Sequence, residues 1–194
     1  MSIEIIVTPD RPDTDKIGPD GVGPVTAGRL RWPGGEAPCV LGRGGVRTDK
    51  REGDGATPVG RFALRRVLWR ADRLPPPETG LPLQPIAERD GWCDAPGDPA
   101  YNRPVVLPYP ASHEEMWRDD HVYDIVVVMG HNDDPVVPGM GSAVFMHLVR
   151  PDRTPTAGCV ALAPEDMLRL LKDCGPGSAL SVAGPAVSDA VACR

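Results

Sequence analysis

A chain of 194 residues can bury one sizeable core, and its 22 glycines and 24 prolines favour short strands joined by turns over long helices. The net charge of −6, with no block of lysine and arginine, argues against nucleic acid as a partner. No run approaches the roughly 18 apolar residues of a membrane span, and the N-terminus as it stands lacks the basic and apolar regions of a secretory signal peptide.

The N-terminal part of the chain predicts strands separated by turns. Residues 3–8 are β-branched and apolar, which predicts a first strand, and a polar link follows over 9–23. Residues 25–32 and 37–41 predict a hairpin that turns at Pro33–Gly–Gly–Glu36. The glycines in 42–45 indicate a sharp turn or a close approach of two backbones.

A long turn-rich loop over 49–60 leads into a predicted strand over 61–70. Phe62 and Leu64 alternate with polar or small residues, and the alternation then slips in phase, as it does at a β-bulge. The charged residues at the start of the loop predict an exposed turn; they are Lys50, Arg51, Glu52 and Asp54.

The C-terminal half predicts two buried strands and the clearest helix. Residues 112–117 resemble the start of a short helix, with Ser112 as N-cap. Residues 122–129 and 141–148 are apolar on both faces, which predicts buried strands, the first of them central. Residues 164–172 predict a helix with Pro164 in its first turn, and 178–182 a closing strand.

These patterns predict one mostly β domain over residues 1–184 with a few short helices. Residues 185–194 carry no core signal, which predicts a disordered tail. No internal repeat and no domain linker is visible in the sequence.

The residues best suited to catalysis are Cys159, which follows Gly158, and His147, which ends an apolar run upstream. Thiol catalysis needs a sulfur that can ionise, an imidazole to accept its proton and free backbone N–H groups nearby. The positive end of the predicted downstream helix would favour the thiolate. A buried structural cysteine is the alternative. The odd cysteine count, without a Cys-x-x-Cys pair, argues against a zinc ribbon or redox dithiol; the cysteines are Cys39, Cys93, Cys159, Cys174 and Cys193.

Two segments resemble the YkuD-type L,D-transpeptidases. Thr156–Ala–Gly–Cys159 with the upstream His147 is similar to the catalytic motif of that family. Glu52–Gly–Asp–Gly–Ala–Thr–Pro–Val–Gly–Arg–Phe62 is similar to its Thr-Pro-x-Gly-x-Phe hairpin. The resemblance covers roughly residues 25–182. It implies a compact β-sandwich or barrel of the L,D-transpeptidase catalytic-domain type.

The chemistry that the resemblance implies is a peptidoglycan cross-link made through a cysteine thioester. Cys159 would be the nucleophile and His147 the proton acceptor and donor, with the backbone N–H groups of Gly158 and Cys159 around the oxyanion. Donor and acceptor stem peptides would be the substrates, a carbapenem would be a covalent inhibitor, and the periplasm or cell envelope would be the location.

The sequence departs from the family pattern at two positions. Ala161 stands where the family often has arginine or asparagine, and Ala157 where a second histidine often precedes the glycine. The polar contact that those residues make with the substrate must come from elsewhere or be lost.

Four further residues are candidates for substrate binding, each with a structural alternative. Thr156 belongs to the cysteine loop. His131 and Asn132 follow the central strand and could line the cleft, although an Asn/Asp turn explains them equally well. Tyr101 could cover the substrate or pack in the core. No metal motif is present, because His131, Asp133 and Asp134 lack any paired-histidine spacing, and no cofactor is expected.

Three other functions remain open at this point. An L,D-carboxypeptidase would use water in place of the acceptor amine and so trim tetrapeptide stems. A sortase-like transpeptidase also has histidine before cysteine, but it needs an arginine on a strand after the cysteine, and Arg169 lies in the predicted helix. A non-catalytic wall-binding module on the same fold would leave Cys159 as inert as Cys39.

Overall fold

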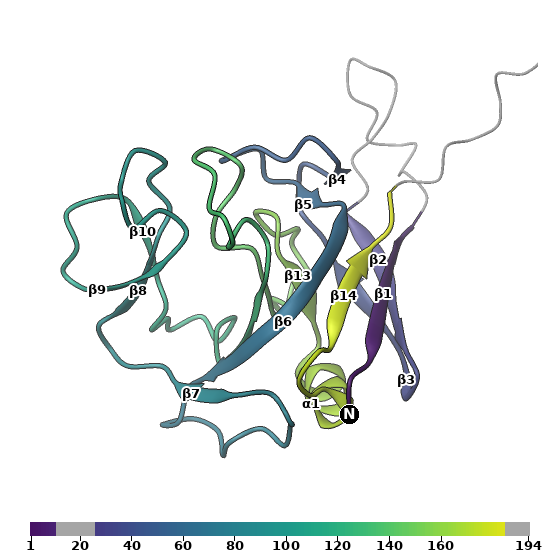
Figure 1. The fold of residues 1–194 in the computed structure, drawn as a ribbon. Coiled ribbons are helices and arrows are strands. Elements are labelled where there is room, and N and C mark those ends of the chain that lie inside the picture. The colour runs from purple at the N-terminus through teal and green to yellow at the C-terminus, as the bar shows by residue number, and fades with distance from the viewer. Residues whose placement is uncertain (11–25, 185–194) are drawn as a thin grey trace, which may run out of the picture.

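The computed structural model describes residues 1–10 and 26–184, which form strands and one α-helix (Figure 1). The predicted tail 185–194 and most of the predicted link 9–23 lie outside the described residues. The strands are β1 (Glu4–Pro9), β2 (Ala27–Trp32), β3 (Gly35–Val40), β4 (Val46–Arg47), β5 (Thr57–Pro58), β6 (Gly60–Trp69), β7 (Leu83–Pro85), β8 (Asp90–Cys93), β9 (Pro104–Val106), β10 (His113–Glu115), β11 (Ile125–Met129), β12 (Phe145–Leu148), β13 (Val160–Leu162) and β14 (Ala179–Val182).

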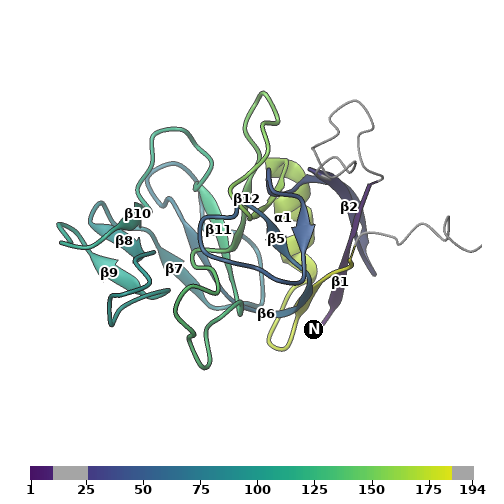
Figure 2. The ribbon, with the colours of Figure 1, turned by 90° about the horizontal axis from the view of Figure 1, so that it is seen from above.

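The main sheet closes on itself into a barrel. Its strand order is β11-β12-β13-β3-β2-β1-β14-β6-β7, and β11 also pairs with β6, so that eight of its strands form a ring and β7 lies outside it. A smaller sheet, β10-β8-β9, projects on the side away from β1–β3 (Figures 1 and 2). The fold is therefore the mostly β domain that the sequence predicts.

The N-terminal strands form as predicted. β2 and β3 pair in antiparallel register from Ala27↔Val40 to Trp32↔Gly35, so the hairpin turns over Pro33 and Gly34. The predicted close approach at 42–45 is also confirmed, because a Cβ on Gly42 would lie 2.2 Å from the backbone oxygen of Gly55. This contact joins the segment after β3 to the loop before β6.

Strand β6 contains the predicted bulge. Val128 of β11 lies opposite Arg66, and Met129 lies opposite Leu64, so Arg65 is the extra residue on β6. Before the bulge Phe62 and Leu64 point into the barrel; after it, Val67 does.

Strands β11 and β12 are buried on both faces because a separate apolar cluster packs on each side. Val127 of β11 and Met146 of β12 face the barrel interior. Val126 and Phe145 face a second cluster, which Trp92 and Met116 of the small-sheet side complete. β11 is central as predicted, between β6 and β12, although the strand begins at Ile125.

One predicted element is wrong. Residues 112–117 do not form a helix: His113–Glu115 is strand β10, paired with Cys93–Gly91 of β8. Glu114, one of the acidic residues that suggested a helix start, accepts a hydrogen bond from the hydroxyl of Tyr123 at 2.7 Å. Strand pairing and this partly buried contact outweigh the local capping signal.

Helix α1 (Pro164–Asp173) is confirmed, with Pro164 in its first turn and Cys174 at its C-cap. Its apolar face joins the barrel core through Met167, Leu170 and Leu171. Asp173 accepts a 2.7 Å hydrogen bond from the indole of Trp32, which fixes the end of the helix against β2. The helix lies between the small sheet and the β1–β2 side in Figure 2.

Candidate active site

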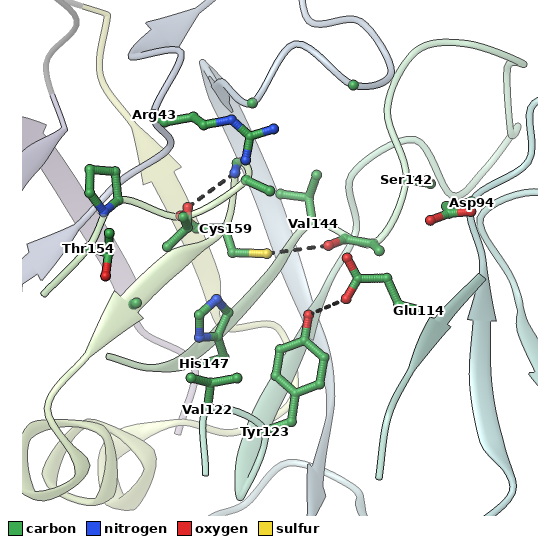
Figure 3. A pocket seen from close by; sticks show the side chains of 18 of the residues that line it. Arg43, Asp94, Glu114, Val122, Tyr123, Ser142, Val144, His147, Thr154 and Cys159 are labelled. Carbon is green, nitrogen blue, oxygen red and sulfur yellow. Dashed lines mark hydrogen bonds between the residues drawn. The ribbon is translucent and has the colours of Figure 1, made fainter. Parts of the chain in front are cut away.

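One cavity of about 390 Å³ contains both predicted catalytic side chains. Cys159 and His147 line it together with Gly158, Thr156 and Ala161. In Figure 3 the imidazole of His147 lies beside the Cys159 side chain on the neighbouring strand.

The parallel register of β12 and β13 brings the two side chains to one face. His147 lies opposite Ala161, and Met146 lies opposite Val160. Side chains along a strand alternate between faces, so Cys159, two residues before Ala161, points to the same face as His147. Ala161, directly opposite His147, also lines the cavity with its small side chain.

The sulfur of Cys159 makes two hydrogen bonds, one with the loop before β12 and one with the first residue of β12. The thiol donates to the backbone oxygen of Ala143 at 3.3 Å, and the sulfur accepts from the N–H of Phe145 at 3.3 Å. Ala143 has a φ of 50°, a left-handed conformation that is uncommon for alanine. Within residues 1–10 and 26–184, the thiol has no hydrogen bond to the His147 ring. In this structure the thiol proton therefore points to the Ala143 carbonyl and not to the imidazole.

His147 is oriented by its neighbour's carbonyl group. Nδ1 lies 2.8 Å from the backbone oxygen of Leu148, and a carbonyl can only accept, so Nδ1 carries the proton and Nε2 has the free lone pair. Tyr123 packs edge-on against the ring, with centroids 5.4 Å apart. Burial lowers the pKa of His147 to about 4, so at neutral pH the imidazole is a neutral proton acceptor.

The thiol is neutral in the resting site. Burial raises the pKa of Cys159 to about 12, and the N–H of Phe145 acts in the opposite direction. The sequence predicted that the start of the downstream helix would favour a thiolate. In the structure, desolvation of the buried sulfur has the largest effect on its pKa, and the thiol form is favoured. Ionisation of this sulfur at neutral pH would therefore need a base that accepts its proton.

Gly158 is required by its backbone conformation. Its φ is 133°, and a Cβ at this position would lie 2.7 Å from the backbone oxygen of Ala56. Its N–H donates to the hydroxyl of Thr156 at 3.1 Å, and that hydroxyl donates to the backbone oxygen of Cys159 at 2.7 Å. Thr156 thus stabilises the loop that carries Cys159, and the Gly158 N–H is already hydrogen-bonded to the Thr156 hydroxyl in this structure.

Sequence reasoning missed two cations that line the cavity. Lys50 was predicted in an exposed turn, which is wrong: it is 6 % exposed and pairs with Asp54. Its ammonium would lie 3.6 Å from a Cβ on Gly158. Arg43 is exposed, lines the same cavity and packs against Gly55. Both side chains reach the cavity because the 42–60 segment folds over the loop that carries Cys159. The residues next to Lys50 and Arg43 in the sequence do not indicate this contact.

Tyr101 lies behind the cavity wall. Its hydroxyl donates to the carboxylate of Glu52, which also accepts from the hydroxyl of Ser142 at 2.7 Å. The Gly141 N–H donates to the same phenol oxygen at 3.1 Å. Glu52 and Ser142 line the cavity, whereas Tyr101 supports them.

His131 and Asn132 lie outside this cavity in the loop after β11. His131 lines a neighbouring cavity, and its Nε2 lies 3.0 Å from the backbone oxygen of Met140. Asn132 donates to the backbone oxygens of Val137 and Gly141, at 3.0 and 2.9 Å. Both residues hold the loop that leads to Ala143.

Asn102 joins three segments around the site. Its carboxamide oxygen accepts from the indole of Trp92 at 2.9 Å and from the Ala143 N–H at 3.1 Å. Its nitrogen donates to the backbone oxygens of His131 and Asn132 at 3.0 and 2.7 Å. By bonding to the Ala143 N–H, the buried Asn102 side chain positions the Ala143 carbonyl, which accepts the hydrogen bond from the Cys159 thiol.

We expect Asn102→Ala to lower the free energy of unfolding by at least about 2 kcal/mol, because it leaves several buried donors and acceptors without partners. Urea unfolding followed by circular dichroism measures this loss. Asn132→Ala is the matched control, since Asn132 also has a left-handed φ, of 48°, but is less buried. Equal losses in the two variants would contradict the central role of Asn102.

The buried imidazole also predicts a loss of stability in acid. The pKa of His147 is about 4 in the folded protein against an ordinary 6.5, so the unfolded chain binds more protons between these values. Stability is fully present above pH 6.5 and falls as the pH drops towards 4, by on the order of 3 kcal/mol. We expect the difference in urea midpoint between pH 7 and pH 4.5 to be clearly smaller in His147→Gln than in the parent. The same acid loss in both proteins would contradict this assignment.

Fold and cavity together define a β-barrel domain that presents a thiol and a neutral imidazole from neighbouring strands. The family model for the YkuD L,D-transpeptidase catalytic domain matches residues 25–182, so the chain belongs to this family. It is thus an L,D-transpeptidase-type catalytic domain of peptidoglycan metabolism, and the family implies a periplasmic or cell-envelope enzyme. Comparisons with curated proteins and with solved structures find no match.

Among the described residues, no helix is long and apolar enough to cross a membrane. The same residues contain no group of three or more histidine, cysteine, aspartate or glutamate side chains arranged to hold a metal ion.

Proposed function

We propose that the protein is a peptidoglycan L,D-transpeptidase that forms stem-peptide cross-links through a thioester on Cys159. The observation that carries this proposal is the placement of Cys159 and His147 in one cavity, on one face of adjacent strands, in a domain of this family. The orientation of His147 by Leu148, which leaves Nε2 as the acceptor, supports the role of base.

The first step is activation of the thiol. The Cys159 side chain turns from the Ala143 carbonyl towards His147, and Nε2 takes the proton as the sulfur attacks the substrate carbonyl between an L-centre and a D-residue. Bound substrate favours this rotation of the Cys159 side chain. The tetrahedral intermediate that then forms needs hydrogen bonds from backbone amides, which the free thiol does not need.

The second step is loss of the terminal D-residue. The oxyanion is held by the N–H groups of Gly158 and Cys159, and Gly158 shares or leaves its bond with the Thr156 hydroxyl. The carbon–nitrogen bond breaks, the leaving amine takes the proton from His147, and a thioester remains on Cys159. The buried ammonium of Lys50 adds positive potential near this charge.

The third step is transfer to a second stem peptide. Its amine loses a proton to His147 and attacks the thioester, which forms the new peptide bond and releases the thiol. We propose that Arg43 supplies the polar contact that Ala161 cannot make. We further propose that Thr156 contacts the substrate, whereas Tyr101, His131 and Asn132 act mainly by holding the cavity wall.

Incubation of the purified protein with a disaccharide-tetrapeptide tests this proposal. Mass spectrometry should show cross-linked dimers that have lost one D-residue. Free tripeptide without dimers would assign an L,D-carboxypeptidase, in which water replaces the acceptor amine. Unchanged substrate, together with no carbapenem adduct on Cys159, would favour a wall-binding module without activity.

A further inference from the structure

A second cavity of about 220 Å³ lies beside the candidate active site, between β6, β11 and the β8–β9 loop. Val144 lines both cavities. Phe145 lines the second one and donates its backbone N–H to the sulfur of Cys159. The two cavities are therefore adjacent at the segment that leads into β12.

The second cavity contains two neighbouring arginines because of the β6 bulge. Consecutive residues on a regular strand point to opposite faces, so Arg65 and Arg66 would ordinarily diverge. Arg65 is the extra residue of the bulge, and both arginines line the cavity. Arg103, from the loop after Asn102, adds a third guanidinium.

The charges in this cavity do not balance. Asp133 is the carboxylate that lines it within the described residues, and Arg65 pairs with it at 2.8 Å. Arg103 donates at 2.8 Å to the backbone oxygen of Asp133, which carries no net charge. Two positive charges, those of Arg66 and Arg103, therefore have no carboxylate partner within residues 1–10 and 26–184.

Arg66 is the most unusual of the three. Its Nε is buried and has no hydrogen-bond partner among the described residues. The guanidinium lies 5.8 Å from the centre of the Trp92 ring. Burial lowers the pKa of Arg66, yet a guanidinium stays charged. An ionised group held partly out of water without a partner costs free energy, so a ligand that pairs with it gains more than it would on the open surface.

We propose that this cavity binds a carboxylate group, held by the guanidinium groups of Arg66 and Arg103. The planar carboxylate matches the paired N–H groups of a guanidinium, Nε included, and Val128 and Phe145 provide an apolar wall for the attached carbons. Because Val144 lines both cavities, we assign this carboxylate to a stem peptide bound in the active-site cavity. This assignment rests on the proposed function.

The first experiment tests the carboxylate site without any activity. We expect malonate, added to protein labelled with ¹⁵N-arginine, to shift the Nε–H resonance of Arg66 in a saturable manner. Assignment uses Arg66→Met, in which that resonance disappears. No shift at Arg66 would overturn the proposal, and a shift with inorganic phosphate but not with malonate would replace the carboxylate by a phosphate.

The second experiment tests the link to the substrate. In the Cys159→Ala protein, we expect Arg66→Met to weaken binding of a free stem tetrapeptide about tenfold or more, as measured by calorimetry. Arg61→Met is the matched control, because Arg61 lies on the same strand but pairs with Glu4 outside the cavity. Its dissociation constant should equal that of the parent. If Arg66→Met fails to fold, Arg103→Met on the exposed loop replaces it.

The outcomes separate this inference from the proposed function. A malonate response without any tetrapeptide binding would retain the carboxylate site and contradict the transpeptidase. Equal tetrapeptide affinity in Arg66→Met and the parent would overturn the substrate link, whatever the activity of the enzyme.

Discussion

Cys159→Ala should reduce cross-linking and carbapenem adduct formation by at least about 10⁴-fold, because in the proposed mechanism Cys159 is the nucleophile that forms the thioester. The loss of stability should be small, about 1 kcal/mol, since the change removes one buried sulfur with its contacts to Ala143 and Phe145. Intact-protein mass spectrometry and urea unfolding measure the two effects.

Cys39→Ala is the matched control for this prediction. Cys39 is equally buried, and burial raises its pKa to about 12 as well, but it lies on β3 in the barrel core. It should keep full activity and a single adduct. An adduct that persists in Cys159→Ala would assign the nucleophile to a different residue.

His147→Gln should slow acylation of Cys159 by about 10²–10⁴-fold at neutral pH. With a thiol pKa of about 12, only about one molecule in 10⁵ carries a thiolate at pH 7 without a base. Glutamine can still donate to the Leu148 carbonyl but cannot accept the proton. Stopped-flow measurement of carbapenem acylation gives the rate.

The pH dependence distinguishes a lost base from a structural defect. Acylation of the parent should fall as the pH drops through about 4, where His147 becomes protonated. Acylation of His147→Gln should instead rise about tenfold per pH unit above neutrality, following the thiolate. His131→Gln, which alters the neighbouring cavity, should keep the parent profile. A flat profile in His147→Gln would contradict the role of base.

The sequence carried enough local signal for most of the barrel. Apolar runs on both faces indicated β11 and β12, although β12 begins only at Phe145 and not at 141. The phase slip in β6 indicated a bulge, which the structure places at Arg65, and Pro164 marked the start of α1. The signal failed at β10, where capping residues imitate a helix and a pairing with β8 decides the structure. Such long-range pairing has no local signature.

The placement of His147 and Cys159 in one cavity agrees with the motif resemblance, but the resting state of the thiol had no signal in the sequence. It depends on Ala143, whose left-handed backbone turns a carbonyl towards the sulfur, and on Asn102, which fixes Ala143 from another loop. The buried Lys50 was missed for a similar reason, since its burial results from loops far apart in sequence.

In the proposed mechanism, the hydrogen bond from Cys159 to the Ala143 carbonyl would also protect the nucleophile from oxidation. Peroxides oxidise the thiolate far faster than the protonated thiol, and sulfinic acid formation is irreversible for most proteins. A proposed nucleophile that stays protonated and buried until substrate arrives would be spared oxidative inactivation in the cell envelope that the family implies, without needing a partner cysteine to restore it.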